Sequence, residues 1–201
     1  MIKIYGHPMS TCTRKVLTTL VENEIPYELE VVDIMQGAHK HQPHMSRQPF
    51  GQIPTMDDSG FKLYESRAIA RYLDEQHGGK LVPKEPQARA LMEQWISIET
   101  SNVSAHLMKF IYEHIFHRKQ DEAVLANAAA KLDEAFAIMD AHLATHKHLA
   151  GEQFSIADIA FMPYFQYAQA TPVKDQIAKY PHVAAWWNRV SERPSWKKVS
   201  A

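Results

Sequence analysis

Two glycines and two prolines lie within residues 78–86, and the chain changes its character on either side of them. Before this segment, short β-branched or alternating runs are interleaved with helical patterns, whereas after it almost every apolar pattern has helical spacing. Clusters of glycine and proline are typical of linkers. The sequence therefore predicts one domain over residues 1–78, a linker over 79–86 and a second domain over 87–201.

The first domain has the pattern of an α/β fold. We expect strands at Ile2–Tyr5, Tyr27–Ile34, Ile53–Met56 and Phe61–Tyr64, and helices over 10–23 and 65–77. The segment Asp57-Asp58-Ser59-Gly60 is a good hairpin signal between the last two strands. With a short helix before the third strand, the order β-α-β-(short helix)-β-β-α is that of a thioredoxin-like domain.

The second domain is predicted to be all-helical. One long amphipathic helix carries apolar residues from Leu91 to Ile111, and a second has helical spacing from Leu125 to Leu143. Ser155–Gln169 and Pro181–Glu192 supply two more helices. The tail from Trp186 to Trp196 indicates aromatic anchoring of the last helix in the core.

Composition excludes several classes of partner. A net charge of −1 with a pI near 6.9 gives no electrostatic reason to expect nucleic acid or an anionic membrane. No apolar run approaches the roughly 18 residues needed to span a bilayer, and a strand beginning at Ile2 leaves no room for a signal peptide. The single cysteine, Cys12, allows no intrachain disulfide, so we expect a reducing, cytoplasmic location.

Ser10 follows a turn at the expected start of the first helix. It either caps this helix, which is worth about 1 kcal/mol, or donates its hydroxyl hydrogen to a bound thiolate. Cys12 competes for the second role, because a thiol in the first turn can form mixed disulfides. Since residues two apart on a helix point in nearly opposite directions, a Ser10 facing the pocket predicts a Cys12 facing the core or the domain edge.

Two short motifs indicate a site for a small, anionic, peptide-like ligand. Pro54 at the start of a strand is either an ordinary edge proline or a cis proline that turns the Ile53 backbone outward. Glu65 and Ser66 open a helix, whose N–H groups favour an anion such as a carboxylate. Glu65 would then hold an ammonium group, although helix capping alone would also explain both residues.

A histidine-rich loop comprises His39, Lys40, His41 and His44. A lysine or histidine there could clamp a terminal carboxylate, and a solvated surface loop is the simpler interpretation. The spacing matches no zinc pattern, so we expect no metal site. Ser155 and Asp158 have capping-box spacing, which indicates that Asp158 holds a helix start and has no chemical role.

Taken together, these motifs resemble the glutathione S-transferases, closest to the phi class. The resemblance is carried in order by GHPMSTCTRKVL (6–17), GAHK (37–40), SRQPFGQIP (46–54), LYESRAI (63–69), FSIAD (154–158) and the tryptophan and Arg-Pro tail. It covers almost the whole chain. It implies a thioredoxin-like domain that binds glutathione and a helical domain that lines the site for a hydrophobic electrophile.

The resemblance also implies roles for individual residues. The serine matching Ser10 hydrogen-bonds the glutathione thiolate. The glutathione-binding positions are His39 and Lys40 for the glycyl carboxylate, Ile53 beside a cis Pro54 for the cysteinyl unit, and Gln52, Glu65 and Ser66 for the γ-glutamyl end. The hydrophobic substrate would contact Met9, Met35, Tyr112, Phe116 and Tyr167. Cys12 departs from many relatives and leaves a redox role open.

The implied activity is conjugation of the glutathione thiolate to hydrophobic electrophiles or its attack on a peroxide oxygen, in a detoxifying homodimer. Glutathione is then a cosubstrate, and no other cofactor is expected. Two alternatives stay open. One is a non-catalytic carrier of hydrophobic ligands, and the other is a Cys12-dependent glutathione thiol transferase.

Overall fold

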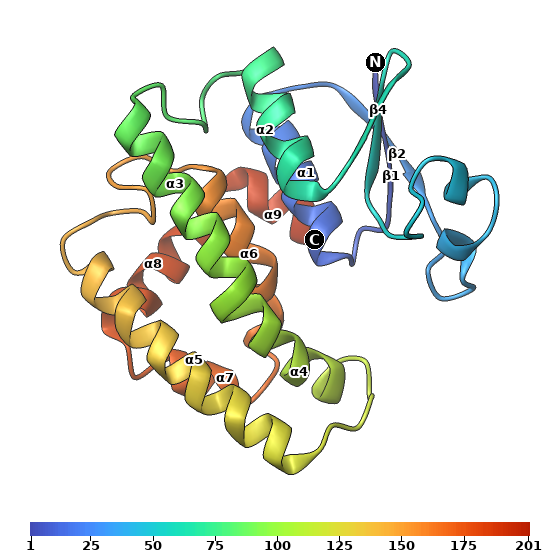
Figure 1. Ribbon diagram of the computed structural model, residues 1–201. Coiled ribbons are helices and arrows are strands. Elements are labelled where there is room, and N and C mark those ends of the chain that lie inside the picture. Colours follow the sequence, from blue (N-terminus) through green and yellow to red (C-terminus); the bar gives the residue numbers. More distant parts are fainter. The chain divides into compact units, whose positions relative to one another are not determined.

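The computed structural model describes residues 1–201, which form two compact units. Unit 1 comprises Met1–Val82 together with Pro194–Ala201, and unit 2 comprises Pro83–Arg193. Figure 1 labels the helices of both units and most of the strands. A mixed α/β unit followed by a helical one confirms the fold class predicted from the sequence.

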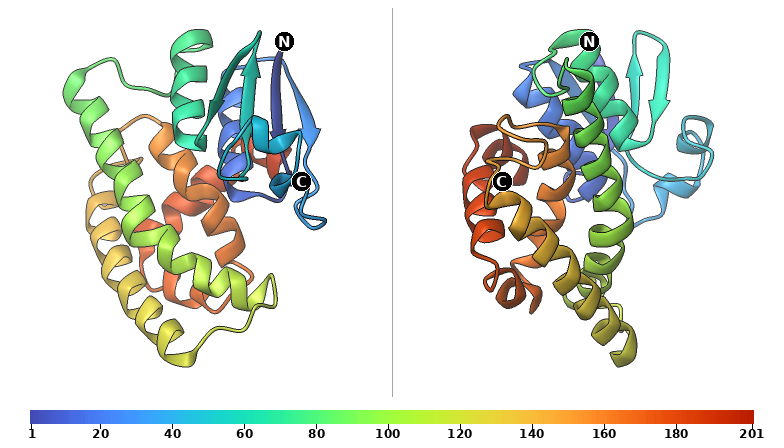
Figure 2. Two further views of the ribbon diagram at one scale, coloured as in Figure 1. Left: turned by 45° about the vertical axis from the view of Figure 1, so that its right-hand side comes forward. Right: turned by 60° about the vertical axis from the view of Figure 1, so that its left-hand side comes forward.

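Unit 1 is built on a four-stranded mixed sheet (Figure 2). Its strands are β1 (Ile2–Gly6), β2 (Tyr27–Val31), β3 (Thr55–Asp58) and β4 (Phe61–Tyr64). They lie in the order β2-β1-β3-β4, with β1 parallel to β2 and antiparallel to β3, and with β3 and β4 forming the predicted hairpin. Because β3 begins at Thr55 and not at Ile53, Ile53 lies outside the hydrogen-bonded ladder.

Helices α1 (Thr11–Glu22) and α2 (Ser66–His77) pack against the sheet and against each other. The 3₁₀ turns η1 (Ala38–Lys40) and η2 (His44–Ser46) occupy the connection between β2 and β3. The core joins apolar side chains of the strands and helices: Ile2, Ile4, Val16, Leu17, Leu20, Ile25, Met56, Ile69, Leu73 and Val199. Alternation in the strands and helical spacing in α1 and α2 bring these residues to one interior.

The C-terminal segment corrects one expectation. Residues 194–201 were expected in the helical domain, but helix α9 (Pro194–Ser200) belongs to unit 1. Val199 joins the unit 1 core, α9 packs on α1, and the Ser195 hydroxyl donates to the Glu22 carboxylate. Apolar spacing alone cannot show which core a short terminal helix joins.

The predicted linker is largely fixed at both of its ends. The buried Asp74 carboxylate of α2 accepts hydrogen bonds from the main-chain N–H groups of Lys80, Leu81 and Val82, at 3.1, 2.9 and 2.8 Å. Glu85 then caps the next helix, whose first residue is Pro86. These bonds explain why unit 1 continues to Val82.

Unit 2 is entirely helical. Its helices are α3 (Pro86–Ile98), α4 (Ala105–His114), α5 (Glu122–Leu143), α6 (Ile156–Ala168), α7 (Val173–Ile177) and α8 (Pro181–Ser191). The long first helix predicted here is interrupted by a π-helical segment, Glu99–Ser104, and α7 was not predicted. None of the helices is both long enough and apolar enough to cross a membrane.

An aromatic cluster fills the interior of unit 2, with the Trp186 ring edge-on to Phe161 and Phe165. Trp186 and Trp187 are buried, as their predicted anchoring role requires. Ser155 and Asp158 form a complete capping box at the start of α6, which confirms the structural interpretation of Asp158.

Candidate functional site

Unit 1 contains a cavity of about 490 Å³. Its walls come from the first turn of α1, the segment after β2, the approach to β3 and the start of α2. The lining residues are Cys12, Ile34, His39, Lys40, Gln48, Gly51, Gln52, Ile53, Pro54, Glu65, Ser66 and Arg67. All seven residues predicted to bind glutathione therefore line this one cavity.

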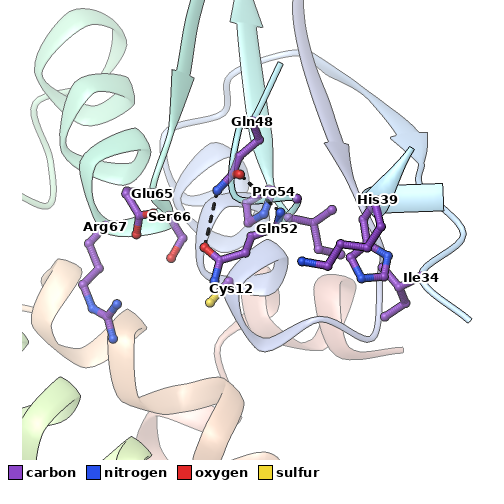
Figure 3. A pocket seen from close by; sticks show the side chains of 12 residues that line it. Cys12, Ile34, His39, Gln48, Gln52, Pro54, Glu65, Ser66 and Arg67 are labelled. Carbon is purple, nitrogen blue, oxygen red and sulfur yellow. Dashed lines mark hydrogen bonds between the residues drawn. The ribbon is translucent and has the colours of Figure 1, made fainter. Parts of the chain in front are cut away.

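Glu65 and Ser66 lie at one end of this cavity (Figure 3). Glu65 is the N-cap of α2 with φ of 73°, yet its side chain makes no capping hydrogen bond. The interpretation of Glu65 as a simple cap is therefore wrong. A positive φ at a non-glycine residue costs roughly 1–3 kcal/mol and is concentrated at functional sites. Its carboxylate and the Ser66 hydroxyl are left available to a ligand beside the positive end of α2.

The middle of the cavity presents an extended backbone. The Ile53–Pro54 peptide bond is cis, as the resemblance implies. The N–H and C=O groups of Ile53 make no main-chain hydrogen bond, because the ladder of β3 starts two residues later. Such an unpaired edge can accept a peptide-like ligand through main-chain hydrogen bonds.

His39 and Lys40 lie in the 3₁₀ turn η1 and line the cavity, with His39 at the end opposite Glu65 (Figure 3). The Lys40 ammonium donates to the Phe50 carbonyl at 3.0 Å. Burial, followed by the positive charges of Lys40, His44 and His41, lowers the pKa of His39 below the usual histidine range. At neutral pH, Lys40 therefore supplies the positive charge at this end and His39 is a neutral hydrogen-bonding group.

The structure corrects the expected direction of Cys12. Cys12 is partly exposed and lines the cavity, whereas Ser10 is not among the lining residues. Ser10 is the N-cap of α1 with an extended backbone (φ −73°, ψ 126°), and its Oγ accepts a hydrogen bond from the Thr13 N–H at 3.3 Å. The helical spacing rule therefore does not apply between Ser10, which precedes the helix, and Cys12, which lies in its first turn.

The Ser10 cap does not exclude a second role. A hydroxyl has two acceptor lone pairs and one hydrogen to donate. Since Oγ acts as an acceptor toward Thr13, its own hydrogen is not used by this bond. Both interpretations of Ser10 are therefore compatible at the N-terminus of α1.

Four lining residues escaped sequence reasoning: Ile34, Gln48, Gly51 and Arg67. Gly51 has a φ of 58°, and a Cβ there would lie 2.9 Å from the His39 carbonyl oxygen. Only glycine lets the two segments approach this closely. The neighbouring Phe50-Gly51-Gln52 pattern could have indicated this, but Gln48, Ile34 and Arg67 carry no local signal for a cavity.

The residues predicted for the hydrophobic substrate do not line this cavity. Met9 and Met35 belong to unit 1 and are exposed, by 51% and 83%. In unit 2, the Phe116 ring lies 6.2 Å from Tyr112 and 6.5 Å from Tyr167, so these three aromatics form one cluster. No group of three or more His, Cys, Asp and Glu side chains is placed to hold a metal ion.

Both halves of the chain match known family profiles. Residues 1–75 match the glutathione S-transferase N-terminal domain, and residues 103–194 match the glutathione S-transferase C-terminal domain. Glutathione S-transferase APIC of Nicotiana tabacum is 33% identical over 204 residues, which cover 98% of this chain and 96% of the tobacco protein. The chain belongs to the glutathione S-transferase family.

Solved structures agree with this assignment. Glutathione transferase F7 from Populus trichocarpa has a TM-score of 0.94 at 34% identity, covering 100% of this chain and 98% of its own. Glutathione S-transferase I from maize, solved with an atrazine glutathione conjugate, has a TM-score of 0.91 at 31% identity. The match covers 99% of this chain and 96% of the maize chain. The plant relatives of the F series are phi-class enzymes, as the sequence motifs implied.

Proposed function

We propose that this enzyme conjugates the thiolate of glutathione to hydrophobic electrophiles, with Ser10 as the thiolate's hydroxyl donor. The observation that carries the proposal is the order of groups along the cavity: a carboxylate and hydroxyl at a helix N-terminus, an unpaired backbone edge, and a cationic end. Glutathione presents an ammonium and carboxylate, a cysteinyl peptide unit and a glycyl carboxylate in the same order.

The charges support this orientation of the tripeptide. Glu65 would pair with the γ-glutamyl ammonium, while Ser66 and the first turn of α2 would bind its carboxylate. Ile53 would pair with the cysteinyl backbone, and Lys40 and His39 would receive the glycyl carboxylate. The thiol then extends toward the N-terminus of α1, where Ser10 and Cys12 lie.

The chemistry needs the thiol as its anion. A free thiol has a pKa of about 8.5, so little thiolate exists at neutral pH. A hydroxyl donor and the positive end of α1 both favour the anion, and a shift of about two units corresponds to roughly 2.7 kcal/mol. The thiolate displaces the halide of an aryl halide, or adds to an activated alkene or isothiocyanate, which then takes up a proton. On a peroxide it attacks one oxygen and breaks the O–O bond, which releases an alcohol and leaves a glutathione sulfenic acid that a second glutathione converts to the disulfide and water. The protein's contribution is thiolate stabilisation and the proximity of the two substrates.

Glu65→Gln tests the binding half of this proposal. The substitution removes the negative charge but keeps the side chain's size, so glutathione affinity should fall about tenfold through loss of one charged hydrogen bond. Calorimetric titration with glutathione measures the affinity, and titration with a des-amino analogue that lacks the ammonium group is the control. The analogue should bind both proteins equally well.

A Glu65→Gln protein that binds glutathione as tightly as wild type would contradict the placement of the ammonium. A wild-type protein that binds hydrophobic ligands but turns over none of a panel of aryl halides, activated alkenes and isothiocyanates would favour a carrier instead. The aromatic cluster of Tyr112, Phe116 and Tyr167 is a candidate surface for such ligands. Homodimer formation, peroxidase activity and a cytoplasmic location stay predictions.

A second candidate function rests on the position of Cys12. Its thiol lines the same cavity as the predicted glutathione-binding residues. The Cys12 thiolate could attack a glutathione mixed disulfide, forming a Cys12–glutathione disulfide and releasing the other thiol. A second glutathione thiolate would then attack this bond, regenerate Cys12 and leave as oxidised glutathione.

Cys12→Ser separates the two functions. It should abolish disulfide exchange on a small glutathione mixed disulfide, while conjugation to an aryl halide keeps at least about half its rate because Ser10 is intact. The two activities are measured on the same preparation, with Thr11→Ser as a conservative control in the same turn. Equal loss of both activities in Cys12→Ser would assign Cys12 to the conjugation reaction itself.

A further inference from the structure

Two buried polar side chains that were not predicted to bind glutathione direct all their side-chain hydrogen bonds to Gln52, which was. His44 is 2% exposed and Gln48 is 1% exposed. The His44 Nε2 lies 2.7 Å from the Gln52 carbonyl oxygen, so this nitrogen carries the hydrogen and donates it. The Gln48 Oε1 accepts from the Gln52 N–H at 3.3 Å, and its Nε2 donates to the Gln52 Oε1 at 3.4 Å.

Gln52 is consequently held at its N–H, its carbonyl and its side-chain oxygen by the same short segment (Figure 3 shows the two bonds from Gln48). The bond to Oε1 leaves the Gln52 Nε2 as a donor for a ligand in the cavity that Gln52 lines. The next residue is Ile53, whose unpaired backbone forms the middle of that cavity. The orientation of Gln52 therefore sets the direction in which this edge leaves the loop.

The segment that holds Gln52 is itself fixed to the sheet. The Arg47 guanidinium, between His44 and Gln48, stacks over the Tyr5 ring of β1 at 3.9 Å and lies 4.0 Å from the Glu30 carboxylate of β2. Burying an imidazole and an amide is costly unless they are hydrogen-bonded. Apolar residues would fill the same space at a lower cost, so the polar pair indicates a requirement to hold Gln52.

We propose that His44 and Gln48 are positioning residues for glutathione, acting through Gln52 on the Ile53 edge. Gln48 also lines the cavity, but both of its amide atoms are bonded to Gln52. This inference rests on the proposed glutathione site. It predicts a selective effect on glutathione, because neither residue is among those predicted to contact the electrophile. Loss of either residue should leave the rate at saturating glutathione largely intact.

The test compares His44→Phe, which fills the space without a donor, with Gln48→Leu, which removes both amide bonds. Each should weaken glutathione binding about fivefold to tenfold, the size expected for losing one or two hydrogen-bonded supports. The KM for glutathione should rise in parallel, while kcat and the KM for an aryl halide stay within about twofold of wild type. His44→Gln, whose amide can donate to the same carbonyl, should recover most of the affinity.

Leu20→Ala is the matched control for a purely structural effect. Leu20 is buried in the unit 1 core near the other end of α1, so its truncation lowers the melting temperature without changing the glutathione KM. Should His44→Phe not fold, Gln48→Met decides alone, because it keeps the volume without adding a charge and loses both bonds to Gln52. Weaker glutathione binding by Gln48→Met at an unchanged melting temperature supports the proposal, and unchanged binding contradicts it.

Two outcomes overturn the inference while leaving the glutathione site in place. In the first, wild type binds glutathione and the His44 and Gln48 variants bind it equally well. In the second, Leu20→Ala weakens glutathione binding as much as they do. Failure of wild type itself to bind glutathione would instead overturn the proposed function, and the inference with it.

Discussion

Ser10→Ala is expected to lower kcat for conjugation about 100-fold, because removal of one hydrogen-bond donor from a developing or stabilised anion costs about that factor. Glutathione affinity should change little, since the residues proposed to bind the tripeptide line the cavity and Ser10 is not one of them. Measured for the electrophile at saturating glutathione, the pH profile of kcat/KM should also move upward by as much as two units, as the bound thiol loses its donor. Steady-state kinetics from pH 6 to 9 with a model aryl halide measure both effects.

The capping role of Ser10 must be separated from this donor role. The Ser10 Oγ accepts from the Thr13 N–H, so Ser10→Ala should also cost about 1 kcal/mol of stability. Ser10→Gly loses the hydroxyl but is a tolerable N-cap, which costs only a few tenths of a kcal/mol. We expect the same loss of turnover in both variants and recovery in Ser10→Thr. Undiminished turnover in Ser10→Gly would show that Ser10 is only a cap and would direct attention to Cys12.

Much of unit 1 could be predicted because its signals are local. Alternating β-branched residues, a turn sequence and helical spacing identify the strands and helices, and the main errors are the ends of β2 and β3. The positions proposed to bind glutathione came from the motif resemblance, and Gln52-Ile53-Pro54 and Glu65-Ser66 each lie at an element boundary. That these positions line one cavity became visible only in the folded structure.

What could not be predicted depends on contacts between distant segments. The direction of Cys12 depends on where helical geometry begins, and this is decided by the Ser10 cap bond. The placement of α9 depends on Val199 finding the unit 1 core, which no short-range pattern specifies. His44 was grouped with a solvated histidine-rich loop, whereas it is buried because its Nε2 finds the Gln52 carbonyl.

Asp158→Ala is expected to destabilise unit 2 by about 3–5 kcal/mol, the range for removing one partner of a buried charged network. Asp158 is fully buried, and its carboxylate accepts from the Ser155 N–H at 3.0 Å, the Leu149 N–H at 3.2 Å and the Trp186 indole N–H at 2.8 Å. Alanine leaves all three donors unpaired in the interior. Urea denaturation followed by tryptophan fluorescence measures the change, since Trp95, Trp186 and Trp187 belong to this unit.

Graded variants show whether the whole network is responsible. Ser155→Ala removes the N-cap acceptor of the Ala157 N–H and the hydroxyl bond to Asp158, and it should cost about 1 kcal/mol. Trp186→Phe keeps a ring but removes the indole donor, so it should cost less than Asp158→Ala and add little to it in the double variant. If Asp158 had a chemical role, its replacement would lower turnover at an unchanged denaturation midpoint. The hydrogen bonds instead predict a large fall in the denaturation midpoint, because Asp158 binds the start of α6 to α8. The folded fraction should keep a kcat near wild type, because Asp158 lies outside the cavity of unit 1.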